Sequence, residues 1–208
     1  MKNCPYNNTC IRFKCDRSCK VYTEFEHWSN RCNLTIKNSL FRVDKSKIIR
    51  ASQLLIAAEN DKSSDSNYIH IGVYSGQDSQ LIGDLATYLA ILKYCSGTGF
   101  YNGVYRLNFQ NYLDEIKSSW DTRYDSPLLG DMKIWIQSCK CLVIYNLGLI
   151  RFGDFESQTL LSIFQERYDE TKTTIVVLEG GKFCLPGRNE SIFYQKLKNE
   201  ISSRGVRL

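Results

Sequence analysis

Residues 68–92 (YIHIGVYSGQDSQLIGDLATYLAIL) constrain the fold more than any other stretch of this sequence. A short apolar run comes first, a turn with glycine follows, and leucines then recur at positions 81, 85, 89 and 92. That spacing places the leucines on one face of a helix. We therefore expect a strand, a turn and a helix in direct succession.

The turn of this unit stands where a phosphate-binding loop would lie, because a glycine-rich turn and a helix N-terminus offer backbone N–H groups to an anion. Such a loop reads Gly, four residues, then Gly-Lys-Ser/Thr. Gly72 opens this frame and Ser79 closes it, but Gln77 replaces the second glycine and Asp78 replaces the lysine. A carboxylate there would repel phosphate by ~1–4 kcal/mol at effective dielectric constants of 80 to 20. An ordinary strand–helix turn is the alternative interpretation.

Strands and helices are expected to alternate through the rest of the chain. Residues 140–148 (KCLVIYNLG) form a continuous apolar run, which is typical of a strand covered on both faces in a parallel sheet. Further strands are predicted over residues 103–108 and 173–178, the latter rich in β-branched residues. This alternation predicts a three-layer α/β domain with a mostly parallel sheet. Helices are predicted over residues 109–120, 128–138, 155–168 and 190–203.

The spacing of apolar residues within these helices also predicts which side chains face the core. They are Tyr112, Leu113 and Ile116 in the first helix, Leu128, Met132, Trp135 and Ile136 in the second, Leu160, Leu161, Phe164 and Tyr168 in the third, and Phe193, Leu197 and Ile201 in the last.

Cysteines are concentrated near the N-terminus, where five of the nine lie within the first 32 residues. Their spacing is C-x5-C-x4-C-x3-C-x12-C, with a histidine between the last two. Zinc takes four such ligands in a tetrahedron, and a segment this short and polar has little else to hold it folded. We expect a structural zinc site; an iron–sulfur cluster and plain reduced cysteines are the alternatives. The tightest ligand group is Cys4, Cys10, Cys15 and Cys19, with Cys32 or His27 as substitutes.

Charge is distributed unevenly along the chain. Residues 1–50 hold 11 Lys and Arg against 4 Asp and Glu, a balance of +7, whereas residues 51–208 hold 16 against 18, a balance of −2. The basic part favours an acidic partner, either nucleic acid or an acidic protein face. Aromatic residues also alternate there with basic ones, a mixture that can stack bases and neutralise phosphates. The miniature core of a zinc module with a solvated rim is the preferred alternative. The basic candidates for contact are Arg12, Lys14, Arg17, Lys20 and Arg31.

Three segments follow from these patterns: a cysteine-rich, basic module over residues 1–44, a helix and polar linker over residues 45–67, and the α/β domain over residues 68–208. The first residues lack the apolar run of a signal peptide, and no later stretch is long enough to span a bilayer. We therefore expect a cytoplasmic protein without a membrane partner. Histidine occurs only at positions 27 and 70, which leaves little basis for nucleophilic Cys–His catalysis.

Four stretches of the domain resemble, in order and phrasing, stretches of one known family: the frame of residues 72–79, FQNYLDEIKSSW at 109–120, CLVIYNLG at 141–148, and FESQTLLSIFQERYDETKTTIVV at 155–177. In the last, a helix ends with Arg-Tyr and a short turn leads to Thr-Ile. Together they resemble the ATPase domain of bacterial helicase loaders of the DnaC/DnaI type, within the AAA+ class. The cysteine-rich module is similar to that of the DnaI branch, which holds zinc and contacts the helicase.

Departures from the family pattern bear on its activity. In the family, the strand matched by residues 141–148 ends in two acids, of which the first helps to hold Mg²⁺ and the second orients the attacking water. Tyr145 and Asn146 stand at these two positions. Leu178 and Glu179 stand where the family tends to place a polar Thr-Asn pair near the γ-phosphate. With Asp78 at the lysine position, these replacements imply a pseudo-ATPase that does not use ATP.

Two functions are consistent with this sequence. The resemblance implies a DNA-replication accessory protein, encoded by a phage or mobile element, that binds a replicative helicase or helicase loader as a non-hydrolysing adaptor. The alternative is a nucleic-acid-binding regulator in which the cysteine-rich basic module contacts single-stranded DNA and the α/β domain is a scaffold.

Overall fold

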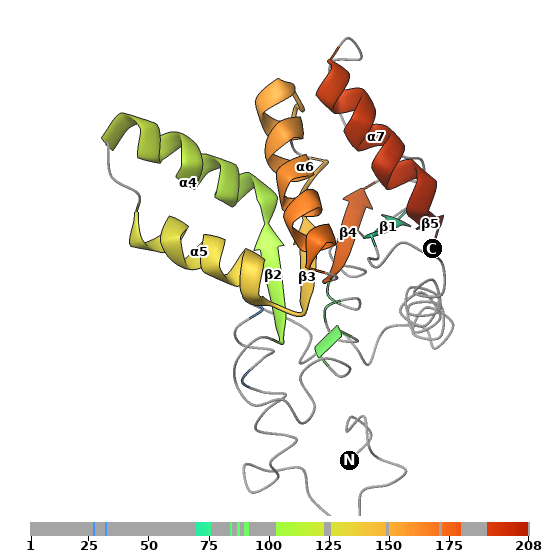
Figure 1. Cartoon of the computed structure of the whole chain (residues 1–208), viewed down its shortest axis with the longest axis horizontal. Coiled ribbons are helices and arrows are strands. Elements are labelled where there is room, and N and C mark those ends of the chain that lie inside the picture. The colour runs from blue at the N-terminus through green and yellow to red at the C-terminus, as the bar shows by residue number, and fades with distance from the viewer. Residues whose placement is uncertain are drawn as a thin grey trace, which may run out of the picture.

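The computed structural model describes residues 27, 32, 70–75, 84, 87, 90, 91, 103–122, 126–148, 150–170, 172–179 and 191–207. Within them the expected alternation of strands and helices is confirmed (Figure 1). The proposed segment boundaries near residues 44 and 67 lie outside the described residues. The elements are β1 (His70–Ser75), β2 (Val104–Asn108), α4 (Phe109–Thr122), α5 (Pro127–Ser138), β3 (Cys141–Tyr145), α6 (Asp154–Asp169), β4 (Thr173–Glu179), α7 (Ile192–Arg204) and β5 (Gly205–Arg207).

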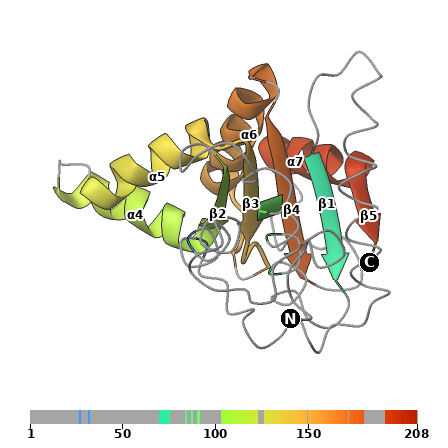
Figure 2. The same cartoon turned by 90° about the horizontal axis from the view of Figure 1, so that it is seen from below.

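The strands form one five-stranded sheet in the order β2-β3-β4-β1-β5, and every neighbouring pair is parallel. Figure 2 shows the strands side by side in this order. The predicted parallel sheet is therefore confirmed. β5 was not predicted, because a three-residue strand carries no pattern of its own; it pairs with β1 through Gly72 and Gly205.

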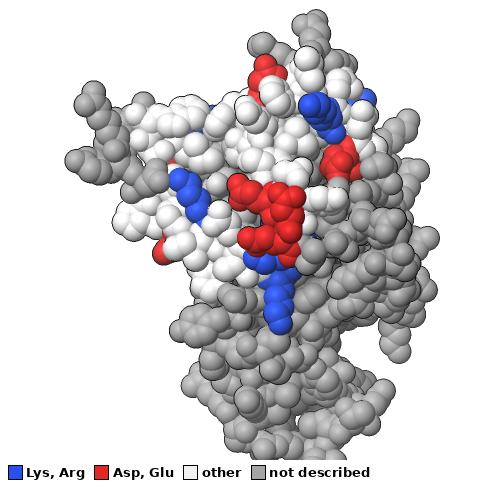
Figure 3. Space-filling model, in the orientation of Figure 1, with Lys and Arg blue, Asp and Glu red and all other residues white. Residues whose placement is uncertain are grey.

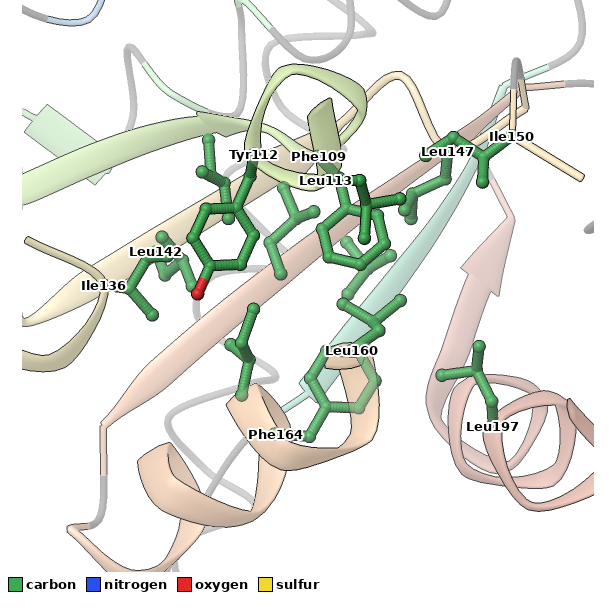
Figure 4. Close-up of a cluster of buried hydrophobic side chains, with 14 of the residues drawn as sticks. Phe109, Tyr112, Leu113, Ile136, Leu142, Leu147, Ile150, Leu160, Phe164 and Leu197 are labelled. Carbon is green, nitrogen blue, oxygen red and sulfur yellow. The ribbon is translucent and has the colours of Figure 1, made fainter. Parts of the chain in front are cut away.

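One face of the sheet is covered by the helices α4 to α7, and the main hydrophobic core lies between them (Figures 1 and 4). Leu107, Leu142 and Ile144 point into it from the strands and are completely buried. The helices contribute a complementary set, including Phe109, Tyr112, Leu113, Ile136, Leu160, Phe164 and Leu197. α4 and α5 form a pair that projects beyond the β2 edge of the sheet (Figure 1).

The opposite face of the sheet is buried as well. Cys141, Val143, Ile175 and Val177 alternate with the residues that face the main core, and each is 2% exposed or less. The described residues of the helix after β1 lie on this side and are also buried: Asp84, Thr87, Ala90 and Ile91. β3 is therefore covered on both faces, as its apolar run predicted, and this agrees with the three-layer domain expected from the alternation of strands and helices.

Two predicted core positions are wrong. Leu128 is 54% exposed and Phe193 is 37% exposed. α5 begins at Pro127 with Ser126 as its N-cap, so that Leu129 and Ile136, which are seven residues apart, form its buried stripe. In α7 the buried stripe similarly begins one residue later, at Tyr194. The inward positions predicted for α4 and α6 are confirmed as buried or partly buried.

Among the residues described above, no helix has both the length and the apolar character needed to cross a membrane.

Candidate functional site

Four parallel strands end at the same edge of the sheet. Asn108 at the end of β2 pairs in register with Tyr145 at the end of β3, and Ser75 at the end of β1 pairs with Glu179 at the end of β4. In open α/β sheets this carboxyl edge is where ligands bind. The edge is therefore the place to look for a functional site, and it brings together residues that are far apart in the sequence.

The end of β3 carries the two residues that the sequence singled out. Tyr145 is the last residue of the strand, and Asn146 follows it with a φ of 61°. Asparagine is one of the few residues other than glycine that enter this left-handed region readily. The chain then turns, with Ile150 N–H donating to the Leu147 carbonyl at 3.2 Å. Hence this strand ends in an aromatic ring and an amide instead of two carboxylates.

The half-buried ring of Tyr145 lies against a buried pair of opposite charges. The guanidinium carbon of Arg106 in β2 lies 4.2 Å from the centroid of the Tyr145 ring. Arg106 Nη1 is also 2.5 Å from Asp84 Oδ1, and the two side chains are only 4% and 5% exposed. Sequence reasoning missed both charged residues. The available signals were an arginine within the apolar strand 103–108, and an aspartate between Leu81 and Leu85 in the helix expected at the end of residues 68–92.

The helix N-termini next to this edge are joined by polar contacts. Asn108 Oδ1 accepts from Asn111 N–H at 3.3 Å and so caps α4. Glu156 in α6 accepts from Gly153 N–H and from Lys117 of α4, both at 3.0 Å. Ser191, just before α7, donates its hydroxyl hydrogen to Asp154. Three helices that begin at or near the carboxyl edge are thereby fixed relative to one another.

These contacts change the pKa of the Glu156 carboxyl. Partial burial works to raise the pKa of its carboxyl, but hydrogen bonds from its own backbone, from Lys117 and from Gly153 outweigh burial. The pKa of Glu156 is therefore held below its usual value of 4.5. Aromatic packing supports the same junction, because the Phe155 ring lies 4.9 Å from the ring of Trp120 in an edge-to-face arrangement.

Most of the predicted phosphate frame cannot be compared with this geometry. Gly72 lies in the middle of β1, between Val176 of β4 and Gly205 of β5. Gln77, Asp78 and Ser79 lie outside the described residues, as does most of the helix with its predicted leucine face. Their roles stay predictions.

The predicted zinc ligands also fall largely outside the described residues. Cys4, Cys10, Cys15 and Cys19 are not among them. Cys32 is buried, with its Sγ 3.7 Å from the carbonyl oxygen of Val104, and His27 is exposed in a helical turn. Within the part of the chain that the structure describes, no three side chains of His, Cys, Asp or Glu are grouped as a metal site would require. The zinc site stays a prediction that concerns the first residues of the chain.

The five basic residues proposed for contact with nucleic acid or a partner, Arg12, Lys14, Arg17, Lys20 and Arg31, also lie outside the described residues. On the described surface shown in Figure 3, Lys and Arg are scattered, and the most extensive group of acidic side chains lies near the centre. Exposed acids on the last turn of α6 and just after it include Glu166, Asp169 and Glu170. Among the described residues, this face therefore offers no basic stripe to a nucleic-acid backbone.

Solved structures with a similar fold come from proteins of DNA replication initiation. One is a DNA replication initiation factor, with a TM-score of 0.57, 15% identity, and 84% of this chain and 49% of that chain covered. Another is domain III of the replication initiation protein DnaA from Thermotoga maritima, with a TM-score of 0.55, 11% identity, and 80% and 63% covered. No model of a known protein family matches the sequence, and no curated protein does so.

These similarities define the class of fold: the domain is an α/β domain with a parallel sheet, similar in structure to domains of replication initiators. The DnaC helicase loader is similar at a TM-score of 0.46 and 15% identity, covering 76% of this chain and 88% of that chain. That score is too low to favour a loader over an initiator. The chain spans about half the length of the first of these solved structures.

Proposed function

We propose that this protein is a DNA-replication accessory factor that binds a replicative helicase or helicase loader as an adaptor and does not hydrolyse ATP. The observation that carries this proposal is the end of β3. Tyr145 and Asn146 stand there, at the positions where the resemblance to AAA+ loaders expects the two acids of the magnesium site.

The contacts of Tyr145 support this interpretation. Mg²⁺ requires hard oxygen ligands in near-octahedral geometry, usually including a carboxylate. The Tyr145 ring instead packs against the Arg106 guanidinium, 4.2 Å from its carbon. A cation held by the protein thus lies next to the strand end, and Asn146 adds an amide that cannot act as a base. An adaptor that can neither hold Mg²⁺ nor activate the attacking water would have to bind its partner without nucleotide.

The partner contact is proposed to lie in the cysteine-rich module, folded around structural zinc. Co-elution with the host's replicative helicase during size-exclusion chromatography, without nucleotide, tests this role. We expect co-elution, and we expect Arg12→Ala/Arg17→Ala/Lys20→Ala to abolish it. The matched control, Lys140→Ala/Arg151→Ala/Lys196→Ala, removes three exposed cations of the described domain and should co-elute like wild type. Failure of the wild type to co-elute with or without ATP would contradict the adaptor role.

The +7 balance of residues 1–50 favours one further candidate, a regulator that binds single-stranded DNA. Such binding depends on counterion release, so its affinity falls steeply as salt rises, in proportion to the number of phosphates neutralised. Titration of a fluorescent oligonucleotide at several salt concentrations distinguishes the two functions. A steep salt dependence that the Arg12/Arg17/Lys20 variant flattens would support the regulator; an absent or salt-insensitive interaction would exclude it.

A further inference from the structure

We infer that Asp84, Arg106 and Tyr145 form an internal clamp that holds the helix after β1 against β2 and β3 in the absence of nucleotide. This inference rests on the proposed function, because only an adaptor that does not use ATP needs such a constitutive link. The three residues come from three elements of the fold. The three residues are far apart in the sequence, so only the fold brings them together.

Burial makes the pair interdependent. The Arg106 and Asp84 side chains are 4% and 5% exposed, and their nearest charged atoms are 2.5 Å apart. Removing one partner of such a pair leaves an uncompensated charge in a medium that solvates it poorly, whereas removing both does not. The position of the helix that carries Asp84 is therefore coupled to the side chain of a strand at the edge of the sheet.

Tyr145 extends the link to a second strand. Arg106 pairs in register with Val143, so Tyr145 is its diagonal neighbour on the same face of the sheet. The Arg106 guanidinium is buried and the Tyr145 ring is half-buried, so water screens this cation–π contact only in part. Within the described residues, Arg106 Nε and Nη2 have no hydrogen-bond partner. Asp84 and Tyr145 thus hold the guanidinium in place.

The clamp lies next to the candidate site. Asp84 lies five residues after Ser79, in the helix whose N-terminus would hold phosphate in a nucleotide-binding relative. Thr87, Ala90 and Ile91 continue the same buried side of this helix and are 2% exposed or less. A helix fixed from the protein side does not require a ligand to position it. The clamp therefore positions this helix through contacts within the protein.

A double-mutant cycle tests the clamp directly. Asp84→Leu and Arg106→Met should each lower the Tm by on the order of 10 °C. The Tm of the double variant should fall by much less than the sum of the two single losses. Tyr145→Leu should also lower the Tm, whereas Tyr145→Phe, which keeps the ring, should not. Lys117→Met and Glu156→Gln provide the control pair, because Lys117 is 46% exposed and its coupling should be small. Additive losses in the Asp84/Arg106 cycle would overturn the clamp.

Hydrogen exchange on the wild-type protein provides a test that needs no variant to fold. Amides of residues 84–91 should exchange slowly without nucleotide, and millimolar MgATP should add no protection. Fast exchange without nucleotide overturns the clamp alone. Protection by MgATP overturns the clamp and shows that the protein binds nucleotide, and a phosphate-release assay then tests the non-hydrolysing role separately. If the Asp84 and Arg106 substitutions give non-additive losses of Tm but the wild type does not co-elute with the helicase, the clamp is supported and the adaptor function is overturned.

Discussion

Arg167 is a charged residue buried where α5, α6 and β4 meet. It is 1% exposed, and its hydrogen bonds all go to neutral acceptors. Nη1 donates to the carbonyls of Ile136 at 2.7 Å and Cys139 at 3.1 Å, while Nε donates to Thr174 Oγ1 at 2.8 Å. The end of α5 carries partial negative charge, which favours a cation there. Arg167 thereby ties the end of α5 to the start of β4.

Replacing Arg167 tests this role. Arg167→Met leaves several buried carbonyls without a donor, and the free energy of unfolding should fall by about 3–5 kcal/mol. Arg167→Lys keeps the charge but loses the planar fork, so its loss should be intermediate. Urea unfolding measures both, with the exposed Arg151→Met as a control that should change little. A loss below about 1 kcal/mol for Arg167→Met would show that these bonds do not stabilise the fold.

The same residue explains part of what the sequence predicted. The Arg-Tyr ending of the helix and the Thr-Ile that follows were among the phrases that resemble helicase loaders. In the structure, Arg167 of that phrase donates to the Thr173 carbonyl and to the Thr174 hydroxyl. The phrase therefore encodes a connection between α6 and β4. Asp84 and Arg106 were missed because apolar periodicity is blind to buried ion pairs.

At the scale of elements, the start of α5 depends on one hydroxyl. Ser126 Oγ accepts from Leu129 N–H at 3.0 Å and donates to Glu115 Oε2 in α4 at 2.7 Å. Ser126→Ala should lower the free energy of unfolding by about 1 kcal/mol. Ser162→Ala, at an exposed position inside α6, is the matched control and should be neutral or slightly stabilising because alanine favours helices. Equal effects of the two substitutions in urea unfolding would argue against a capping role for Ser126.

The contact between α4 and α6 should make stability depend on pH. The folded pKa of Glu156 lies below 4.5, chiefly because hydrogen bonds and Lys117 outweigh its partial burial. Its contribution is therefore present above the unfolded pKa and is lost as the pH falls through the folded pKa. Wild type should be more stable than Glu156→Gln at neutral pH, and the difference should vanish in acid. Urea unfolding from about pH 7 to about pH 3 measures it; a difference that grows in acid would contradict the assignment.

The positions of strands and helices were predicted more reliably than the helix faces that are buried. The continuous apolar run of β3 and the β-branched run of β4 leave little choice but strands buried on both sides. The inward face of α5 was misassigned because Leu128 and Leu129 are adjacent, and only the N-cap at Ser126 decides which of them joins the stripe of Ile136. Capping is a local hydrogen-bond choice that apolar spacing does not encode.

At the scale of the whole molecule, the sequence predicted alternation but not the order of strands. β1 and β2 are consecutive among the described strands, yet β3 and β4 lie between them. That order follows from long-range pairing, which no local pattern specifies. It places Tyr145 beside Asn108, and it sets the end of β1 beside the end of β4. The candidate site could be predicted as a set of positions, but its cluster with Asp84 and Arg106 depends on this assembly.

The adaptor hypothesis makes its strongest prediction for Asp78, because one substitution there restores the lysine of the phosphate-binding frame. If repulsion at Asp78 were the only defect, Asp78→Lys would recover nucleotide binding. The end of β3 argues otherwise, since Tyr145 and Asn146 offer no carboxylate for Mg²⁺ or for the attacking water. Asp78→Lys should therefore show no phosphate release from MgATP, measured against a catalytically active AAA+ protein as the positive control. Turnover by this single variant would mean that residues other than the two at the end of β3 supply the magnesium site. It would also mean that Asp78 alone prevents hydrolysis in the wild-type protein.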